Sequence, residues 1–90
     1  MLKQLENLFY LARDRKKTPI EGSYTNKLLA NKNLSKSKVL EEIHELIEAV
    51  EQSSNKIHEA ADVLYHLAIY FETNDIKIEE IMSELEKRKK

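Results

Sequence analysis

The sequence predicts an all-α fold, in which four to five helices form a bundle within one domain that covers residues 1–90. Two observations indicate this fold. The chain contains one Gly and one Pro, the residues that most often interrupt helices, and 34% of its residues are charged. Apolar residues also recur three and four positions apart along most of the chain, as they do on one face of a helix.

The first two predicted helices are separated by the helix-breaking residues Pro19 and Gly22. The apolar positions of the first helix are Leu2, Leu5, Leu8, Phe9 and Ala12. This helix is expected to fade in the basic stretch 13–17. Ser23 is a good N-cap for the second helix, which is expected to end within 31–33.

Three longer amphipathic segments follow. The third helix is expected to begin within 35–37, where serines offer N-caps, and to end near Gln52. Its apolar face is formed by Val39, Ile43, Leu46, Ile47 and Val50. The segment 53–55 is a tight connection, so the fourth helix, about 56–72, is expected to return antiparallel. A turn at 74–75 then precedes a last amphipathic helix.

The fourth helix differs from the others because apolar residues occupy almost every side of it. Residues 60–71 read AADVLYHLAIYF, a pattern typical of a helix that is buried all round. Only Glu59, Asp62 and His66 form a polar stripe, which spans a sector of roughly 60°. We expect this histidine to bond to Asp62 or to backbone, whereas His58 is expected to face away from the stripe, as is His44 on the third helix.

More acidic residues border the apolar face of the third helix, namely Glu42 and Glu45, with Glu41 further round. Unpaired ionised carboxylates in a protein interior are costly. If the acidic edges of the third and fourth helices face each other, they therefore require a divalent cation. Oxygen ligands favour Mg²⁺ or Mn²⁺ over Zn²⁺. If the two edges face solvent separately, no metal is needed.

Composition excludes several other classes of protein. The formal net charge of −1 gives no general attraction to nucleic acid or to a membrane surface. No apolar run is long enough to span a bilayer, and no signal peptide precedes the first helix, so a cytoplasmic protein is expected. Without cysteine, a chain of 90 residues must supplement its small core with a metal, a second subunit or both.

Three segments taken together resemble a known enzyme family. They are GSYT at 22–25, KVLEEIHE at 38–45 and HEAADVLYH at 58–66. In this order they are similar to the phosphoribosyl-ATP pyrophosphohydrolase family, within the MazG-like all-α nucleotide pyrophosphohydrolases. The resemblance covers nearly the whole chain. It implies Mg²⁺-dependent hydrolysis of phosphoribosyl-ATP to phosphoribosyl-AMP and pyrophosphate, the second step of histidine biosynthesis.

The resemblance also implies roles for individual residues and partners. The metal ligands are expected to be Glu42, Glu45, Glu59 and Asp62. The catalytic candidates are Glu41, Glu42 and Glu45. Among the substrate-binding candidates, the resemblance favours Ser23, Tyr24 and Thr25. Charge, or position beside the acidic residues, adds Arg13, Lys38 and His66, although an ion pair with Glu42 is an alternative role for Lys38. A homodimer or higher homo-oligomer is expected, and association with a phosphoribosyl-AMP cyclohydrolase is left open.

Two other functions remain open from the sequence. A MazG-like housekeeping enzyme acting on nucleoside triphosphates would share the acidic residues but would not predict the segment 23–25. A non-catalytic helical dimerisation module would use the apolar fourth helix. The chain also departs from the family pattern at Lys32 and Leu40, where the family usually has Gly, and it has one extra residue between Pro19 and Ser23.

Overall fold

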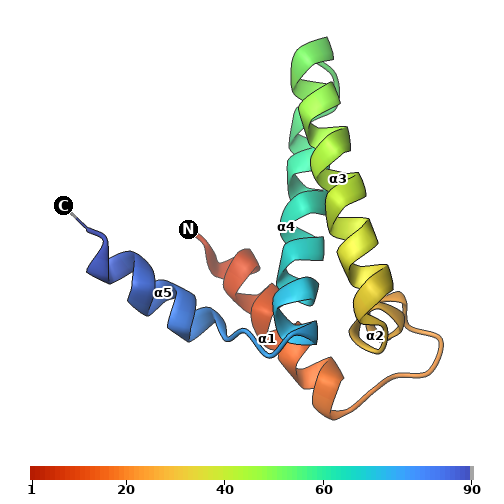
Figure 1. Cartoon of the computed structure of the whole chain (residues 1–90), viewed down its shortest axis with the longest axis vertical. Coiled ribbons are helices and arrows are strands. Elements are labelled where there is room, and N and C mark those ends of the chain that lie inside the picture. Colours follow the sequence, from red (N-terminus) through yellow and green to blue (C-terminus); the bar gives the residue numbers. More distant parts are fainter. Residues whose placement is uncertain (90) are drawn as a thin grey trace.

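The computed structural model describes residues 1–89 and confirms the all-α prediction, because the regular elements of this part of the chain are all helices. The last residue of the predicted domain, Lys90, lies outside the described residues. The helices are α1 (Lys3–Lys17), α2 (Tyr24–Leu29), α3 (Lys32–Gln52), α4 (Lys56–Thr73) and α5 (Ile78–Lys87). Figure 1 shows that α3 and α4 form a long antiparallel hairpin, while α5 projects away from the body as an arm.

Three helix boundaries differ from the sequence prediction, the first because α2 ends at Leu29, before the expected 31–33. Helix α1 continues through the basic stretch to Lys17, where positive charge near the C-terminus is favourable for the helix dipole. Helix α3 begins one turn earlier than predicted, because Asn31 accepts a hydrogen bond from the backbone N–H of Leu34 at 3.0 Å and caps the helix. The predicted capping residue Ser35 instead lies buried within α3.

The other boundaries agree with the sequence. Ser23 caps α2 by accepting a hydrogen bond from the backbone N–H of Asn26 at 3.2 Å. Helix α3 ends where Ser53 adopts a left-handed conformation with φ 52°, and the chain then reverses into α4. Asp75 also has a positive φ, of 58°, in the predicted turn before α5.

The core lies where α1, α2 and the C-terminal half of α4 meet. Ala12, Leu28 and Ile69 come from these three helices and are fully buried. The side chains packed around them are Leu29, Leu34 and Tyr65. The rings of Phe9 and Phe71 stack with their centroids 6.3 Å apart and join α1 to α4. This core holds α2 against the helix that carries the predicted polar stripe.

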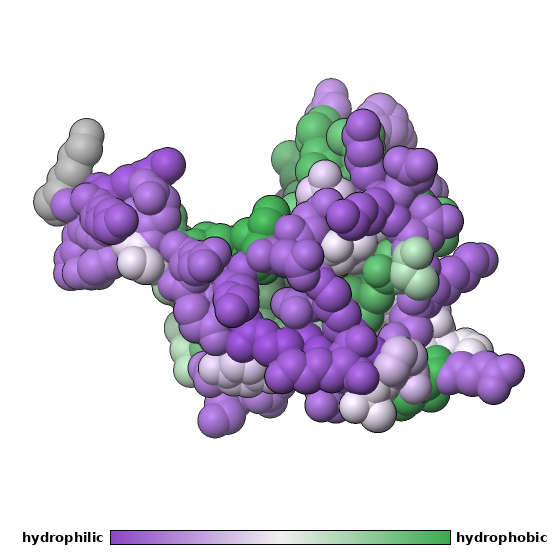
Figure 2. Space-filling model, turned by 60° about the horizontal axis from the view of Figure 1, so that its bottom comes forward, coloured by the Kyte–Doolittle hydropathy of each residue, from purple (hydrophilic) through white to green (hydrophobic). Residues whose placement is uncertain are grey.

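Much apolar surface remains exposed, so the prediction that α4 is buried all round is wrong for the single chain. Its residues Ile57 and Leu64 are 85% and 47% exposed. On α3, the predicted core positions Ile43, Ile47 and Val50 are also exposed, together with Leu40. We call these six residues the hairpin apolar face. Figure 2 shows further hydrophobic surface, in green, between the α5 arm at the left and the rest of the molecule.

The arm α5 contacts α1 across an open groove of about 590 Å³. The groove is lined by apolar residues that include Leu2, Phe9 and Met82. At one end, the guanidinium of Arg13 donates to both carboxylate oxygens of Glu79, at 2.8 and 2.6 Å. None of the described helices is both long and apolar enough to cross a membrane.

Candidate functional site

The antiparallel hairpin brings the acidic edges of α3 and α4 together. One carboxylate oxygen from each of Glu42, Glu45 and Glu59 lies within 4.8 Å of the others. A second group, with ligand atoms equally close, joins Glu59 to Asp62 and His58. Because Glu59 belongs to both groups, the four predicted metal ligands form one continuous acidic cluster. Of the two arrangements that the sequence left open, the structure therefore shows the one in which the edges face each other.

Two carboxylate oxygens of this cluster lack the partners that buried oxygens require. Glu42 is only 8% exposed, and neither its Oε2 atom nor that of Glu59 has a hydrogen-bond partner among residues 1–89. Burial raises the pKa of Glu42, and the neighbouring carboxylate of Glu45 raises it further. Burial likewise raises the pKa of Glu59, with added repulsion from Glu45 and Asp62. A cluster of four carboxylates, two of which have an unpartnered oxygen, is a donor set that suits a hard divalent cation.

His58 corrects one prediction about this cluster. Its side chain is exposed, as expected, but its Nε2 atom lies 3.3 Å from Oδ2 of Asp62 instead of facing away. The spacing of four residues between them was a signal that the sequence offered. His44 is different, because it pairs with Glu48 at 2.8 Å and does not join the acidic cluster.

His66 links the acidic helix to α2. Its Nδ1 atom lies 2.8 Å from the carbonyl oxygen of Asp62, which confirms the predicted bond to backbone. A carbonyl oxygen only accepts, so Nδ1 carries a proton, and in that tautomer Nε2 is an acceptor. The hydroxyl of Tyr24 lies 3.2 Å from this Nε2 atom and donates to it. The buried imidazole is thereby fixed in both position and tautomer.

The segment 23–25 is docked directly beside this histidine. Thr25 is 8% exposed, and its hydroxyl forms a short hydrogen bond with the hydroxyl of Tyr65 on α4. Tyr24 is 45% exposed, and partial burial raises the pKa of its hydroxyl. The N-terminal turn of α2 therefore lies against the same helix as two of the predicted metal ligands, with the Tyr24 ring partly open to solvent.

The predicted cationic residues lie in different places. Lys38 bonds to Glu41 at 3.2 Å, rather than to Glu42, and this bond raises the pKa of Lys38. Arg13 is engaged by Glu79 and lies toward the α5 arm. Within the basic stretch, Arg15 instead reaches the predicted segment, because its Nη1 atom donates to Oγ of Ser23 at 3.0 Å. Sequence reasoning did not single out Arg15 from its basic neighbours.

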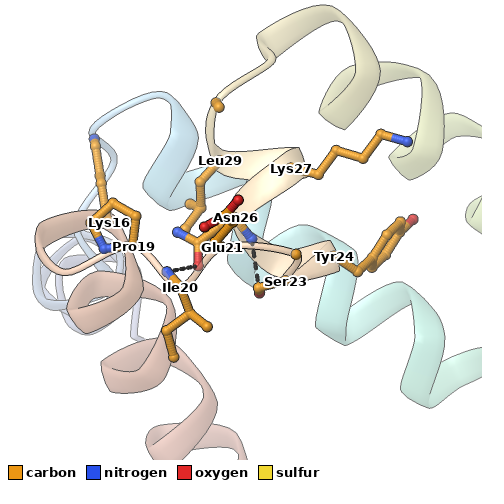
Figure 3. Close-up of a pocket in the computed structure, with 11 residues that line it drawn as sticks. Lys16, Pro19, Ile20, Glu21, Ser23, Tyr24, Asn26, Lys27 and Leu29 are labelled. Carbon is orange, nitrogen blue, oxygen red and sulfur yellow. Dashed lines mark hydrogen bonds between the residues drawn. The ribbon is translucent and has the colours of Figure 1, made fainter.

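A hollow of about 760 Å³ opens beside Ser23, between the end of α1, the loop 18–23 and α2 (Figure 3). Asn26 holds its walls together. The carboxamide oxygen of Asn26 accepts from the backbone N–H of Ile20 at 2.9 Å (Figure 3). Its Nδ2 atom donates to the carbonyl oxygen of Arg15 at 2.8 Å. The loop also turns at Gly22, whose φ of 82° favours glycine.

Comparison with known proteins places the chain in a family. Residues 2–89 match the sequence model of the phosphoribosyl-ATP pyrophosphohydrolase family. A phosphoribosyl-ATP pyrophosphatase of Clostridium acetobutylicum is 42% identical over 88 residues, which cover 93% of this chain and 79% of the relative. A phosphoribosyl-ATP pyrophosphatase of Halobacterium salinarum is 34% identical over 91 residues, covering 94% of this chain and 96% of the relative.

One longer relative carries a second activity in its name. The histidine biosynthesis bifunctional protein of Pyrococcus furiosus is 42% identical over 91 residues, and this chain spans 42% of its length. No solved structure gives a significant match. Because the family description covers nearly the whole chain and the shorter relatives match over most of their own length, this chain belongs to the phosphoribosyl-ATP pyrophosphohydrolase family.

Proposed function

We propose that this chain hydrolyses phosphoribosyl-ATP to phosphoribosyl-AMP and pyrophosphate, as the names of its relatives indicate for those proteins. The observation that carries the proposal is the buried carboxylate of Glu42. It faces Glu45 and Glu59 with an unpartnered oxygen, in a chain of this family. A purely structural helix pair would gain stability by replacing such acids with apolar residues. Their presence between α3 and α4 therefore favours a role in catalysis.

We propose Glu42, Glu45, Glu59 and Asp62 as the ligands of Mg²⁺, with Mn²⁺ as a substitute. The support is the oxygen-only donor set and the two orphaned oxygens. When bound, such an ion neutralises phosphate oxygens and makes a bound water more acidic. The four carboxylates would hold the ion between α3 and α4, where the only partly buried Glu45, Glu59 and Asp62 leave it open to a phosphate.

Two further side chains at the edge of the cluster suit the phosphoanhydride. Glu41 is exposed beside Glu42 and is a candidate to accept the proton of the attacking water, as is Glu45. Lys38, whose pKa the bond to Glu41 raises further above neutrality, carries a positive charge and can donate to a phosphate oxygen. On the other side, Tyr24 and His66 form the hydrogen-bonded wall against which the nucleotide would lie.

We also propose that two copies of the chain form a homodimer through the hairpin apolar face. The support is that six large apolar side chains are exposed on two adjacent helices of a small chain. Apolar surface gathered in this way is typical of a protein–protein interface. A twofold axis would pair the face with itself, so each chain would bury the surface of the other. The second copy thus supplies the burial that the α4 sequence predicted.

A partner for the next step is a separate proposal. The Pyrococcus relative is bifunctional by name and is more than twice as long as this chain. We propose that a separate phosphoribosyl-AMP cyclohydrolase associates with this chain and takes up its product. Co-purification of the two proteins at micromolar concentration would support the association, and independent elution would contradict it.

The decisive experiment is incubation with phosphoribosyl-ATP and Mg²⁺, with and without a chelator, followed by pyrophosphate detection. We expect pyrophosphate in a 1:1 ratio to phosphoribosyl-AMP, and none with the chelator. A panel of ordinary nucleoside triphosphates tests the housekeeping alternative, which predicts faster turnover of that panel. Absence of turnover on every nucleotide would instead favour the non-catalytic dimerisation module.

A further inference from the structure

Ser23 presents an unusual hydrogen-bonding arrangement at the edge of the hollow in Figure 3. Its Oγ atom accepts from the backbone N–H of Asn26 at 3.2 Å, as Figure 3 shows. The same atom accepts from Nη1 of Arg15 at 3.0 Å. A serine hydroxyl has two acceptor lone pairs and one O–H donor. Both lone pairs are therefore used, and the O–H remains to donate. The ligand that this hydroxyl can bind must be an acceptor.

Arg15 adds more donors beside this hydroxyl. A guanidinium carries five N–H groups, and one of those of Arg15 is used on Ser23. Among residues 1–89, no carboxylate forms an ion pair with Arg15. Its neighbours differ, because Arg13 is paired with Glu79 and Lys16 with Asp75. The positive charge of Arg15 is thus left for an anion, and a fork of N–H groups fits a phosphate.

The backbone of Arg15 is held by Asn26, and its guanidinium is held by Ser23. Its carbonyl oxygen accepts from the side chain of Asn26, whose own oxygen holds the backbone of Ile20. Guanidinium and loop are consequently held in one hydrogen-bonded unit. Ser23 is followed by Tyr24, whose hydroxyl reaches His66. Through Tyr24, this unit is connected to the helix that carries Glu59 and Asp62.

We propose that Arg15, together with the Ser23 hydroxyl, binds the phosphate of the phosphoribosyl group and so distinguishes phosphoribosyl-ATP from ATP. This inference rests on the proposed function. The substrate has phosphates at two ends, a triphosphate and the phosphate of its additional ribose. The acidic cluster and Lys38 serve the triphosphate end. Ser23, to which Arg15 is bonded, instead lines a hollow of about 760 Å³ that can take a sugar. Arg15 is then a residue that determines specificity.

The test compares KM for phosphoribosyl-ATP with the inhibition constant of ATP in the same assay. For Arg15→Gln we expect KM to rise roughly 10- to 100-fold, the loss typical of one charged hydrogen-bonded contact, with kcat retained. The inhibition constant of ATP should stay unchanged. Arg15→Lys should recover part of the loss, because it keeps the charge without the fork. Lys17→Gln removes a charge from an exposed neighbour and should change neither constant.

Ribose 5-phosphate serves as a probe of the same contact. It should inhibit the wild-type enzyme competitively and inhibit Arg15→Gln at least roughly 10-fold more weakly. An equal loss of phosphoribosyl-ATP and ATP binding would overturn the inference, because Arg15 would then hold the triphosphate. An unchanged KM, or a loss confined to kcat, would overturn it as well. Failure of the wild type to hydrolyse phosphoribosyl-ATP at all would contradict the proposed function instead, before any variant is compared.

Discussion

The hydroxyl oxygen of Tyr24 lies 3.2 Å from Nε2 of His66, and this contact joins the short helix α2 to the helix that carries Glu59 and Asp62. The other ring nitrogen of His66 is occupied by the carbonyl oxygen of Asp62. Movement of α2 is therefore coupled to the acidic side of α4 through one buried imidazole. The geometry of the nucleotide site depends on both helices.

Tyr24→Phe tests this coupling. The variant removes the O–H that Nε2 of His66 accepts, while the ring and its packing stay. We expect kcat/KM for phosphoribosyl-ATP to fall roughly 10-fold and the free energy of unfolding to fall by about 1 kcal/mol, the net contribution of a typical hydrogen bond. Steady-state kinetics and urea unfolding measure the two quantities. Equal activity of variant and wild type would show that the contact has no part in catalysis.

Removing single charges from the acidic cluster should abolish turnover without unfolding the chain. Glu42→Gln and Asp62→Asn keep side-chain shape but lose a ligand charge, so we expect kcat to fall at least roughly 100-fold, as for loss of a major electrostatic contribution. Glu48→Gln is the matched control, because Glu48 pairs with His44 outside the cluster. Pyrophosphate release gives the rates, and far-UV circular dichroism checks helicity. Retained activity in both cluster variants would sink the assignment.

The helical architecture and the acidic cluster were predictable because each depends on local periodicity. Spacings of three and four residues placed Glu42 and Glu45 on one helix edge and Glu59 and Asp62 on another, and the tight segment 53–55 made the edges face each other. The cap at Ser23 and the bond of His66 to backbone were predictable for the same reason.

Features that depend on tertiary contacts were not predictable. Asn31 follows α2 and also caps α3, and the sequence favours neither role over the other. The choice between Arg13 and Arg15 depends on where the α5 arm and the loop 18–23 lie, since Glu79 takes the first and Ser23 the second. Likewise, periodicity identifies an apolar face on α3 but not whether the same chain or a second copy covers it.

Magnesium should stabilise the protein in a pH-dependent way. Folding raises the pKa values of Glu42 and Glu59 above the usual 4.5. Without metal, the protonated side chains therefore stabilise the folded state relative to the unfolded state, and this stabilisation is complete below pH 4.5. That stabilisation is lost as pH rises through their raised pKa values. The carboxylates are then ionised, so protons no longer compete with Mg²⁺ for the same oxygens. We therefore expect the Mg²⁺-induced increase in Tm to grow from pH 5 to 7, with a gain of about 2.7 kcal/mol at 100 times Kd.

The control for this titration is Glu42→Gln, which should shrink the Mg²⁺-induced increase at pH 7 and raise the stability of the metal-free protein, because the amide carries no buried charge. Differential scanning fluorimetry with Mg²⁺, Mn²⁺ and chelator measures both effects. A Tm that does not change on addition of Mg²⁺ at any pH would contradict the metal proposal.

A charge on the hairpin apolar face should separate the two copies. Ile47→Glu places a carboxylate on a side chain that is 52% exposed in the single chain and that the dimer would bury. Because twofold symmetry doubles the change, we expect a monomer at micromolar concentration and a lower Tm, since each buried apolar side chain is worth about 1.5–3 kcal/mol. Light scattering during gel filtration measures the mass. Glu48→Lys, on the polar side of α3, should remain dimeric, and a wild-type monomer would contradict the proposal.

The α5 arm should loosen in acid, because the Arg13 guanidinium holds the pKa of Glu79 at about 2, below the usual 4.5. For a carboxylate whose pKa is lowered by folding, the stabilisation is complete above pH 4.5 and is lost as pH falls toward 2. Glu79→Gln should therefore speed amide hydrogen exchange in α5 at pH 7, whereas variant and wild type should exchange alike near pH 2. Glu80→Gln, one residue along the same helix, should match the wild type at both pH values.

The ion pair of Arg13 and Glu79 is exposed, so the effect should stay local to α5 and leave the exchange of α3 and α4 unchanged. Equal exchange of α5 in Glu79→Gln and wild type at pH 7 would show that the apolar contacts with α1 alone hold the arm.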